Sequence, residues 1–200
     1  MELTIPAGAA AVLLGYLAGS LPTGVLVARA RGVDLTQVGS GNIGATNVAR
    51  ALGKKLGVLV LLVDALKGYL PIALARAAFA GDPALPTLVA AVGLAAIAGH
   101  VFPIWLRLRG GKGVATACGV FLAIAPLPAA AAFGLWIAIF AAKRIASLAS
   151  LTAATALPIA LAVHGEPPAT LALGGTAWLV IVVRHRSNIR RLLRRDELTL

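Results

Sequence analysis

The chain has 200 residues, of which 60% are apolar and 12% are charged, and its formal net charge is +11. A soluble domain has about 45–50% apolar and about 25% charged residues, so this composition excludes both a soluble globular domain and a disordered chain. Cys118 is the only cysteine, which excludes a disulfide framework. The remaining class is an all-α integral membrane protein, and the length indicates one domain over residues 1–200.

Apolar stretches that can cross about 30 Å of hydrocarbon recur along the chain. A signal peptide fits the first stretch poorly, because no Lys or Arg precedes Arg29. The fourth stretch is too long for one upright helix, and Pro126 and Pro128 predict that it divides into two helices. The sequence therefore predicts seven transmembrane segments, or six if the fourth stretch is one tilted helix. The stretches cover residues 5–28, 56–80, 85–106, 114–142, 148–163 and 170–183.

The charges predict the orientation of these segments. With seven segments, the basic residues fall in connections on one side, and of the 18 Lys and Arg residues only Lys67 and Arg76 lie elsewhere. The opposite side holds Glu2, Asp82 and Glu166 and no basic loop residue. Cationic loops stay cytoplasmic, so we expect the N-terminus outside and the C-terminus in the cytoplasm. The positive charge thus reflects topology and loop ligands, and it does not indicate a nucleic-acid partner.

The connection after the first stretch contains three glycines, at 39, 41 and 44, among small polar residues. Glycines allow successive backbone N–H groups to face one anion, and the guanidinium of Arg50 matches a phosphate. The pattern favours a site for a phosphate or another polar ligand over a flexible connector. Its side-chain hydrogen-bonding groups are Ser40, Asn42, Thr46 and Asn47.

A second glycine-rich connection, residues 107–113, precedes the fourth stretch. Gly110, Gly111, Lys112 and Gly113 at the start of a helix form a typical anion site, although a tight turn with basic residues is the alternative. It is not a nucleotide-hydrolysing P-loop, because Lys112 is followed by Gly113 and not by Ser or Thr.

Two later connections place polar residues at helical spacing. Ser147 and Ser150 share a helix face, where they contact either a ligand or a neighbouring helix. His185 and Asn188 share a face in the same way. We interpret the arginines that follow as contacts to anionic lipid headgroups, namely Arg190, Arg191, Arg194 and Arg195.

Within the second stretch, Asp64 and Lys67 lie three residues apart. Each would cost about 2.5–3.5 kcal/mol unpaired at the bilayer centre, so we expect a mutual, structural pair that faces the bundle. We expect His100 to be a packed or interfacial histidine. The sequence has no metal-ligand pattern and no convincing Ser-His-Asp triad, so we expect no metal and no cofactor. A site rich in donors and cations suits phosphorylated substrates and electrostatic catalysis.

These motifs match a known family in order and spacing across essentially the whole chain. They resemble the acyl-phosphate-dependent glycerol-3-phosphate acyltransferases of bacterial membranes, the PlsY family. The matching segments are GSGNIGATNVAR at 39–50, GHVFPIWLRLRGGKGVATACG at 99–119, the two serines, and HRSNIRRLL at 185–193. One departure is Arg194-Arg195, where family members commonly carry a glycine shortly before the tail Glu197. The His-x4-Asp motif of other glycerol-phosphate acyltransferases is absent from the sequence.

The resemblance implies transfer of a fatty acyl group from acyl phosphate to the 1-hydroxyl of glycerol 3-phosphate. The products are lysophosphatidate and phosphate, in the first acylation of phospholipid synthesis. It also implies a multi-pass protein of the bacterial cytoplasmic membrane with a cytoplasmic active site. The implied partners are the two substrates and membrane lipid, with no nucleic acid and no obligate protein partner. A phosphorylated-solute transporter and a lipid-binding scaffold are the rival functions.

The resemblance also assigns residues. Glycerol 3-phosphate is held by Arg50, Lys112, His185 and Asn188, with Ser147 or Ser150 beside it. The acyl-phosphate head is held by the amides of Ser40, Gly41 and Asn42, together with Thr46 and Asn47. A substrate phosphate oxygen, rather than a protein base, takes the hydroxyl proton. Which loop binds which phosphate is open. We expect catalytic roles for Ser40, Asn42, Arg50, Lys112, His185 and Asn188, and substrate contacts for Gly41, Thr46, Asn47, Gly110, Gly111, Gly113, Ser147 and Ser150.

Overall fold

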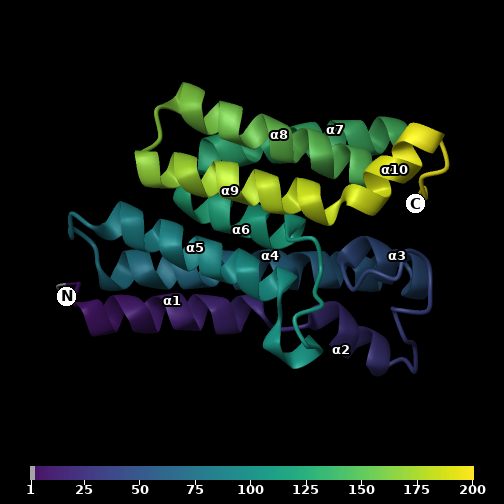
Figure 1. The fold of residues 1–200 in the computed structure, drawn as a ribbon, viewed down its shortest axis with the longest axis horizontal. Helices are drawn as coiled ribbons and strands as arrows, with labels where there is room; N and C mark the ends of the chain where they lie inside the picture. Colours follow the sequence, from purple (N-terminus) through teal and green to yellow (C-terminus); the bar gives the residue numbers. More distant parts are fainter. Residues whose placement is uncertain (1–2) are drawn as a thin grey trace.

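The computed structural model describes residues 3–200, and within them the regular secondary structure is entirely helical (Figure 1). Glu2, which we counted on the outer side, lies outside the described residues. In chain order the helices are α1 (Ile5–Gly19), α2 (Thr23–Arg29), α3 (Ala45–Leu52), α4 (Lys54–Ala78), α5 (Leu85–Val101), the short 3-10 helix η1 (Ile104–Leu106), α6 (Val114–Ile124), α7 (Pro126–Lys143), α8 (Ala146–His164), α9 (Pro168–Arg184) and α10 (Arg186–Arg194).

The predicted apolar stretches all form helices. In the described part of the chain, five segments are long and apolar enough to cross a membrane, and two shorter apolar helices accompany them. The predicted division of residues 114–142 is confirmed, because α6 ends at Ile124 and α7 begins at Pro126. Proline fits the first helical turn, where its missing N–H leaves no hydrogen bond unmade. The five segments are Ile5–Arg29, Lys54–Ala78, Leu85–Leu106, Pro126–Lys143 and Ala146–His164, and the shorter ones are Val114–Ile124 and Pro168–Arg184.

The expectation of one continuous helix over residues 5–28 is wrong. The helix ends at Gly19, and the chain resumes as α2 at Thr23 in a different direction (Figure 1). Pro22 causes this break, because proline disfavours a helical conformation in the residue before it, here Leu21. The Leu21 carbonyl at the break accepts two hydrogen bonds, one of 3.0 Å from the Thr23 amide and one of 2.8 Å from the Lys67 ammonium.

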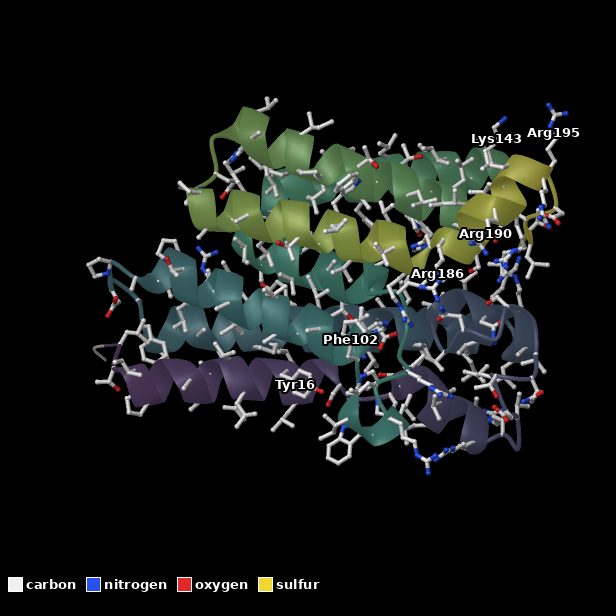
Figure 2. All side chains as sticks on the ribbon, viewed as in Figure 1. Tyr16, Phe102, Lys143, Arg186, Arg190 and Arg195 are labelled. Carbon is white, nitrogen blue, oxygen red and sulfur yellow. The ribbon has the colours of Figure 1, made fainter. Side chains whose placement is uncertain are left out.

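Small residues bring the helices into close contact. A side chain on Gly119 of α6 would collide with the Ala65 carbonyl of α4, and one on Gly68 of α4 would collide with the Thr116 carbonyl of α6. Such small residues are typical of helix packing in membranes, where backbone approach and dispersion drive association. At the end of α5, the Tyr16 hydroxyl of α1 donates to the Phe102 carbonyl at 2.8 Å, and Figure 2 shows these two residues together.

The bundle has two ends with different contents. The start of α1 and the α4–α5 and α8–α9 connections lie at one end, and α2, α3, α10 and the C-terminus lie at the other (Figure 1). The acidic connections containing Asp82 and Glu166 therefore lie away from the basic segments. This is the grouping that the charge pattern predicts. The side of the membrane that each end faces stays a prediction.

Candidate active site

A cavity of about 300 Å³ lies among α3, α4, α6, α7, α8 and α10. It brings together eleven of the fourteen predicted site residues, although they come from four separate connections. The exceptions are Gly41, Gly110 and Gly111, which do not line it. The eleven residues are Ser40, Asn42, Thr46, Asn47, Arg50, Lys112, Gly113, Ser147, Ser150, His185 and Asn188.

His185 stands at the junction of α9 and α10 and is almost fully buried. Its Nδ1 lies 2.8 Å from the Ile181 carbonyl, and a carbonyl only accepts, so Nδ1 carries the proton. Burial, together with the nearby Lys112 charge, lowers the pKa of His185 from 6.5 to about 4. The ring is therefore neutral near pH 7, and its Nε2 is available as a hydrogen-bond acceptor.

Lys112 and Asn188 form the centre of a polar chain across the cavity. The Lys112 ammonium donates to the Asn188 side-chain oxygen, and the Asn188 amide donates to a Glu197 oxygen at 2.8 Å. Burial is the main reason that the pKa of Lys112 falls from 10.5 to about 8; Glu197 opposes this shift and neighbouring arginines support it. Lys112 thus remains largely cationic at neutral pH and is directed at the cavity by Asn188.

Sequence reasoning missed Glu197 as a site residue. Glu197 lines the cavity, and it accepts a hydrogen bond of 2.9 Å from Arg191 as well as the one from Asn188. The interpretation of Arg191 as a lipid contact is therefore wrong, because its guanidinium pairs with Glu197 inside the protein. The signal in the sequence was the pair of carboxylates, Asp196 and Glu197, at the end of an arginine-rich segment, because a buried charge needs a partner.

The second glycine-rich connection is held by its own backbone. The amides of Gly110 and Gly111 donate to the Val101 and His100 carbonyls at 3.1 Å each. The Arg184 guanidinium donates to the Gly110 carbonyl at 2.8 Å and to the Gly111 carbonyl at 3.2 Å. These two glycines therefore position the connection instead of offering it as an anion nest. The part of this connection that lines the cavity is Lys112 and Gly113, followed by Val114 and Ala115 in the first turn of α6.

The first glycine-rich connection is organised by Asn47, which is buried. Its side-chain amide donates to the Leu35 and Val38 carbonyls at 3.2 and 3.0 Å, and its oxygen accepts from the Ser40 amide at 2.9 Å. The Gly41 amide donates to the Val38 carbonyl at 3.0 Å. Two of the amides that we expected to bind an anion are thus used within the connection. The side chains of Ser40 and Thr46 line the cavity, and the first amides of α3 have no partner within their own helix.

Arg50 lies at the edge of the cavity and contacts the C-terminal segment. Its Nε donates to the Thr199 carbonyl at 3.2 Å, and a terminal nitrogen donates to the Leu198 carbonyl at 3.0 Å. Partial burial lowers the pKa of Arg50 without discharging it. Within residues 3–200 no carboxylate forms an ion pair with this guanidinium, so its charge is available to an anionic ligand.

The two predicted serines differ in their partners. The Ser150 hydroxyl accepts a hydrogen bond of 3.0 Å from the Trp136 indole, which stacks on Phe140 with ring centroids 4.9 Å apart. The Ser147 hydroxyl is buried, lines the cavity and has no hydrogen-bond partner among the described residues. An orphaned buried hydroxyl at a cavity wall indicates a ligand contact. The two serines therefore differ: the Ser147 hydroxyl faces the cavity without a described partner, and the Ser150 hydroxyl holds the Trp136 indole.

The predicted intramembrane pair is confirmed. The Lys67 ammonium lies 2.8 Å from the Asp64 carboxylate, and both side chains are buried. His100 is packed, as expected, and its Nδ1 lies 3.0 Å from the Thr116 hydroxyl. Asp64 and His100 form part of the cavity wall. Among the residues that the structure describes, no group of three His, Cys, Asp or Glu side chains could hold a metal ion.

Away from the polar residues the cavity is apolar. Leu61, Leu62 and Leu122 line it, and a smaller space of about 60 Å³ adjoins it between α6, α7 and α8. Phe133 and Trp136 border both spaces. A cavity with cations at one end and aliphatic side chains at the other fits a ligand with an anionic head and an apolar tail.

Comparisons with known proteins agree with this chemistry. The family model described as glycerol-3-phosphate acyltransferase matches residues 9–195. A glycerol-3-phosphate acyltransferase of Myxococcus xanthus (strain DK1622) is 51% identical over 189 residues, which cover 94% of this chain and 97% of that protein. One from Geobacter sulfurreducens is 49% identical over 179 residues, which cover 90% of each.

Two solved structures are also similar. The glycerol 3-phosphate form of PlsY, an integral membrane glycerol 3-phosphate acyltransferase, superposes with a TM-score of 0.92 at 43% identity, over 97% of this chain and 96% of that one. The lysophosphatidic acid form of PlsY gives a TM-score of 0.88 at 42% identity, over 97% of this chain and 95% of that one.

Proposed function

This chain belongs to the glycerol-3-phosphate acyltransferase family, and from that premise we propose that it is an acyl-phosphate:glycerol-3-phosphate O-acyltransferase. It moves a fatty acyl group from acyl phosphate to the sn-1 hydroxyl of glycerol 3-phosphate. Lysophosphatidate and inorganic phosphate are the products, in the first acylation step of phospholipid synthesis. The relatives with solved structures are described in glycerol 3-phosphate and lysophosphatidic acid forms, which supports the acceptor and the product.

The observation that carries the proposal is the pairing of Lys112 with Asn188 beside the unpartnered Ser147 hydroxyl. A cation, an amide and a free hydroxyl in one buried wall match the phosphate and hydroxyls of glycerol 3-phosphate. Arg50 contributes a second cation at the edge of the same cavity. We therefore assign glycerol 3-phosphate to the wall formed by Arg50, Lys112, Ser147 and Asn188.

The head of the acyl phosphate then lies at the N-terminus of α3. The first amides of α3 and the side chains of Ser40, Asn42 and Thr46 supply its hydrogen bonds. The acyl chain extends along Leu61, Leu62 and Leu122 toward the hydrocarbon. Two phosphorylated substrates are then held by separate elements of one cavity.

Positioning and charge stabilisation supply the catalysis. The glycerol hydroxyl oxygen bonds to the acyl carbon, the bond from that carbon to the phosphate oxygen breaks, and phosphate leaves with the bonding electrons. His185 Nε2 accepts a hydrogen bond from the attacking hydroxyl. With a pKa of about 4, His185 is a weaker base than a phosphate oxygen, whose second pKa is about 6. The hydroxyl proton therefore goes to a substrate phosphate oxygen.

We place the protein in the bacterial cytoplasmic membrane with seven crossings, the N-terminus outside, and the active site and C-terminus in the cytoplasm. The crossings are α1 with α2, α4, α5, α6, α7, α8 and α9. The separation of basic and acidic connections at the two ends of the bundle supports this orientation (Figure 1).

The test is phosphate release by purified protein given palmitoyl phosphate, with and without glycerol 3-phosphate. We expect release that requires the acceptor, with one lysophosphatidate formed per phosphate. Palmitoyl-CoA in place of palmitoyl phosphate is the matched donor control and gives no product. Release without acceptor would indicate a hydrolase. Binding of glycerol 3-phosphate without any release would overturn the proposal in favour of a transporter.

A further inference from the structure

Helix α10 presents a basic face away from the active site. Four residues lie along one side of this helix, because successive members are four, three and one positions apart: Arg186, Arg190, Leu193 and Arg194. All four are exposed, and Leu193 is 81% exposed. The opposite side of α10 carries Asn188, which is buried in the cavity wall. Arg186, Arg190, Leu193 and Arg194 are called the basic face below.

The charges of the basic face are not neutralised within the protein. Two acidic residues follow α10: Glu197 is taken by Asn188 and Arg191, and Asp196 forms no ion pair with a described basic side chain. The three arginines of the basic face form no ion pair with a described carboxylate. Arg195 and Lys143 lie at the same end of the bundle, as Figure 2 shows together with Arg186 and Arg190. The face therefore carries three arginines that no described carboxylate pairs with, which gives it a positive potential.

The location of the basic face indicates what neutralises it. α10 begins directly after α9, an apolar helix that ends at Arg184. A short helix with arginines and an exposed leucine at the end of a membrane helix lies in the headgroup layer. An acidic soluble protein would account for the arginines, but it would not account for an exposed leucine beside a membrane helix. We propose that the basic face binds anionic phospholipid headgroups and that this contact stabilises α10 over the active site.

The effect of lipid on α10 and the active site rests on the proposed function. The basic face and Asn188 lie on opposite sides of the same nine-residue helix. Asn188 directs Lys112, so a lipid contact that reduces the motion of α10 also keeps Lys112 in its binding position. Anionic lipid is then expected to lower the KM for glycerol 3-phosphate. The chemistry that recognises the lipid is a phosphate of the headgroup with an adjacent apolar chain for Leu193.

Lipid binding is tested without reference to activity. The wild-type protein and the variant R186Q/R190Q/R194Q are placed in nanodiscs of phosphatidylcholine containing spin-labelled phosphatidylglycerol, and the immobilised fraction is measured. One cation near an anionic surface contributes about 1 kcal/mol, so we expect the triple variant to bind at least about tenfold more weakly. The control variant R29Q/R31Q/K54Q removes three exposed cations from other elements. At an ionic strength of about 0.15 M it should bind the labelled lipid within about twofold of wild type, because salt screens charges that lie more than about 8 Å from the bound headgroup.

Equal loss in the two variants would overturn the proposal, because the effect would be that of net charge alone. Unchanged lipid binding by R186Q/R190Q/R194Q would also overturn the proposal. If that variant bound lipid normally but lost activity in cells, the basic face would instead bind an acidic protein. The KM for glycerol 3-phosphate tests the coupling: it should fall with added phosphatidylglycerol for the wild type and the control, but not for R186Q/R190Q/R194Q. If the wild-type KM does not change with lipid composition, lipid binding at the basic face is not coupled to glycerol 3-phosphate binding. If the proposed function itself is wrong, no lipid composition gives turnover, yet the spin-label measurement still reports binding.

Discussion

Lys112 and Asn188 are 76 positions apart in the chain, and the ammonium of one donates to the amide oxygen of the other. The contact joins the connection before α6 to the helix that follows α9. Because Asn188 also donates to Glu197, its amide orientation is determined, and the oxygen faces Lys112. The position of the Lys112 ammonium at the cavity therefore depends on the position of α10.

Replacing Asn188 with alanine should raise the KM for glycerol 3-phosphate and lower kcat/KM by about 10- to 100-fold, the range expected for losing a hydrogen bond to a charged group. The reason is that Lys112 loses the acceptor that directs it into the cavity. Steady-state kinetics with palmitoyl phosphate measure this. Ser187→Ala, at the exposed neighbouring position, is the control and should match wild type. Wild-type kinetics in Asn188→Ala would contradict the assignment.

The pKa of Lys112 near 8 predicts an alkaline limit to substrate capture. Below this pH the ammonium is charged and attracts the phosphate, and above it the charge is lost. Since kcat/KM reports the free enzyme, kcat/KM should fall by up to about tenfold per pH unit above pH 8. Lys112→Arg stays charged across this range and should lack this decline, even if its absolute activity is lower. A decline of equal midpoint in Lys112→Arg would assign the ionisation to another group.

His185→Ala should weaken glycerol 3-phosphate binding more than it changes the pH dependence of kcat. Its pKa of about 4 keeps the ring neutral throughout the working range, so no ionisation of His185 is available to shape that profile. We expect a rise in KM of about tenfold or more from losing the acceptor at Nε2. The pH profile of kcat from pH 5 to 9 is the measurement. Loss of one limb of that profile with an unchanged KM would instead make His185 a general base.

Replacing each of the two serines should affect a different property, substrate binding for Ser147 and protein stability for Ser150. Ser147→Ala removes a buried hydroxyl without an internal partner, so it should raise the KM for glycerol 3-phosphate and leave the melting temperature unchanged or slightly higher. Ser150→Ala leaves the Trp136 indole N–H without its acceptor, and it should lower the free energy of unfolding by about 1–3 kcal/mol. Thermal unfolding in detergent, together with KM, compares them. The reverse pattern would exchange the two roles.

The Asp64–Lys67 pair predicts strong non-additivity. Asp64→Asn leaves the buried Lys67 ammonium without its counter-charge and should destabilise the protein by about 3–5 kcal/mol. Asp64→Asn combined with Lys67→Met removes both charges and should recover most of that loss. Thermal unfolding of the two single variants and the double variant forms the cycle. If the double variant is as unstable as the sum of its parts, the two charges do not act as a pair.

Much of the fold could be predicted, because apolar length and proline placement act locally. The division at Pro126 and the shared faces of Ser147 with Ser150 and of His185 with Asn188 needed only helical geometry. The break at Pro22 was missed because the surrounding residues are apolar on both sides, so the hydropathy pattern continues through it. Helix α3 lies within a connection for which the sequence analysis predicts no helix, because its eight residues are too few and too polar to stand out as an apolar stretch.

The sequence by itself determined the class of protein, its apolar segments and the residue types of its site, since composition, helical spacing and the motifs are local properties of the chain. Only the tertiary structure decided which hydrogen-bonding groups of the predicted site residues are already used within the protein. It assigns the amides of Ser40 and Gly41 to the connection itself, pairs Arg191 with the unexpected Glu197, and leaves Ser147 free while Ser150 holds Trp136. The physical reason is that a hydrogen-bonding group has limited capacity, and whether that capacity is already used depends on partners far away in the chain.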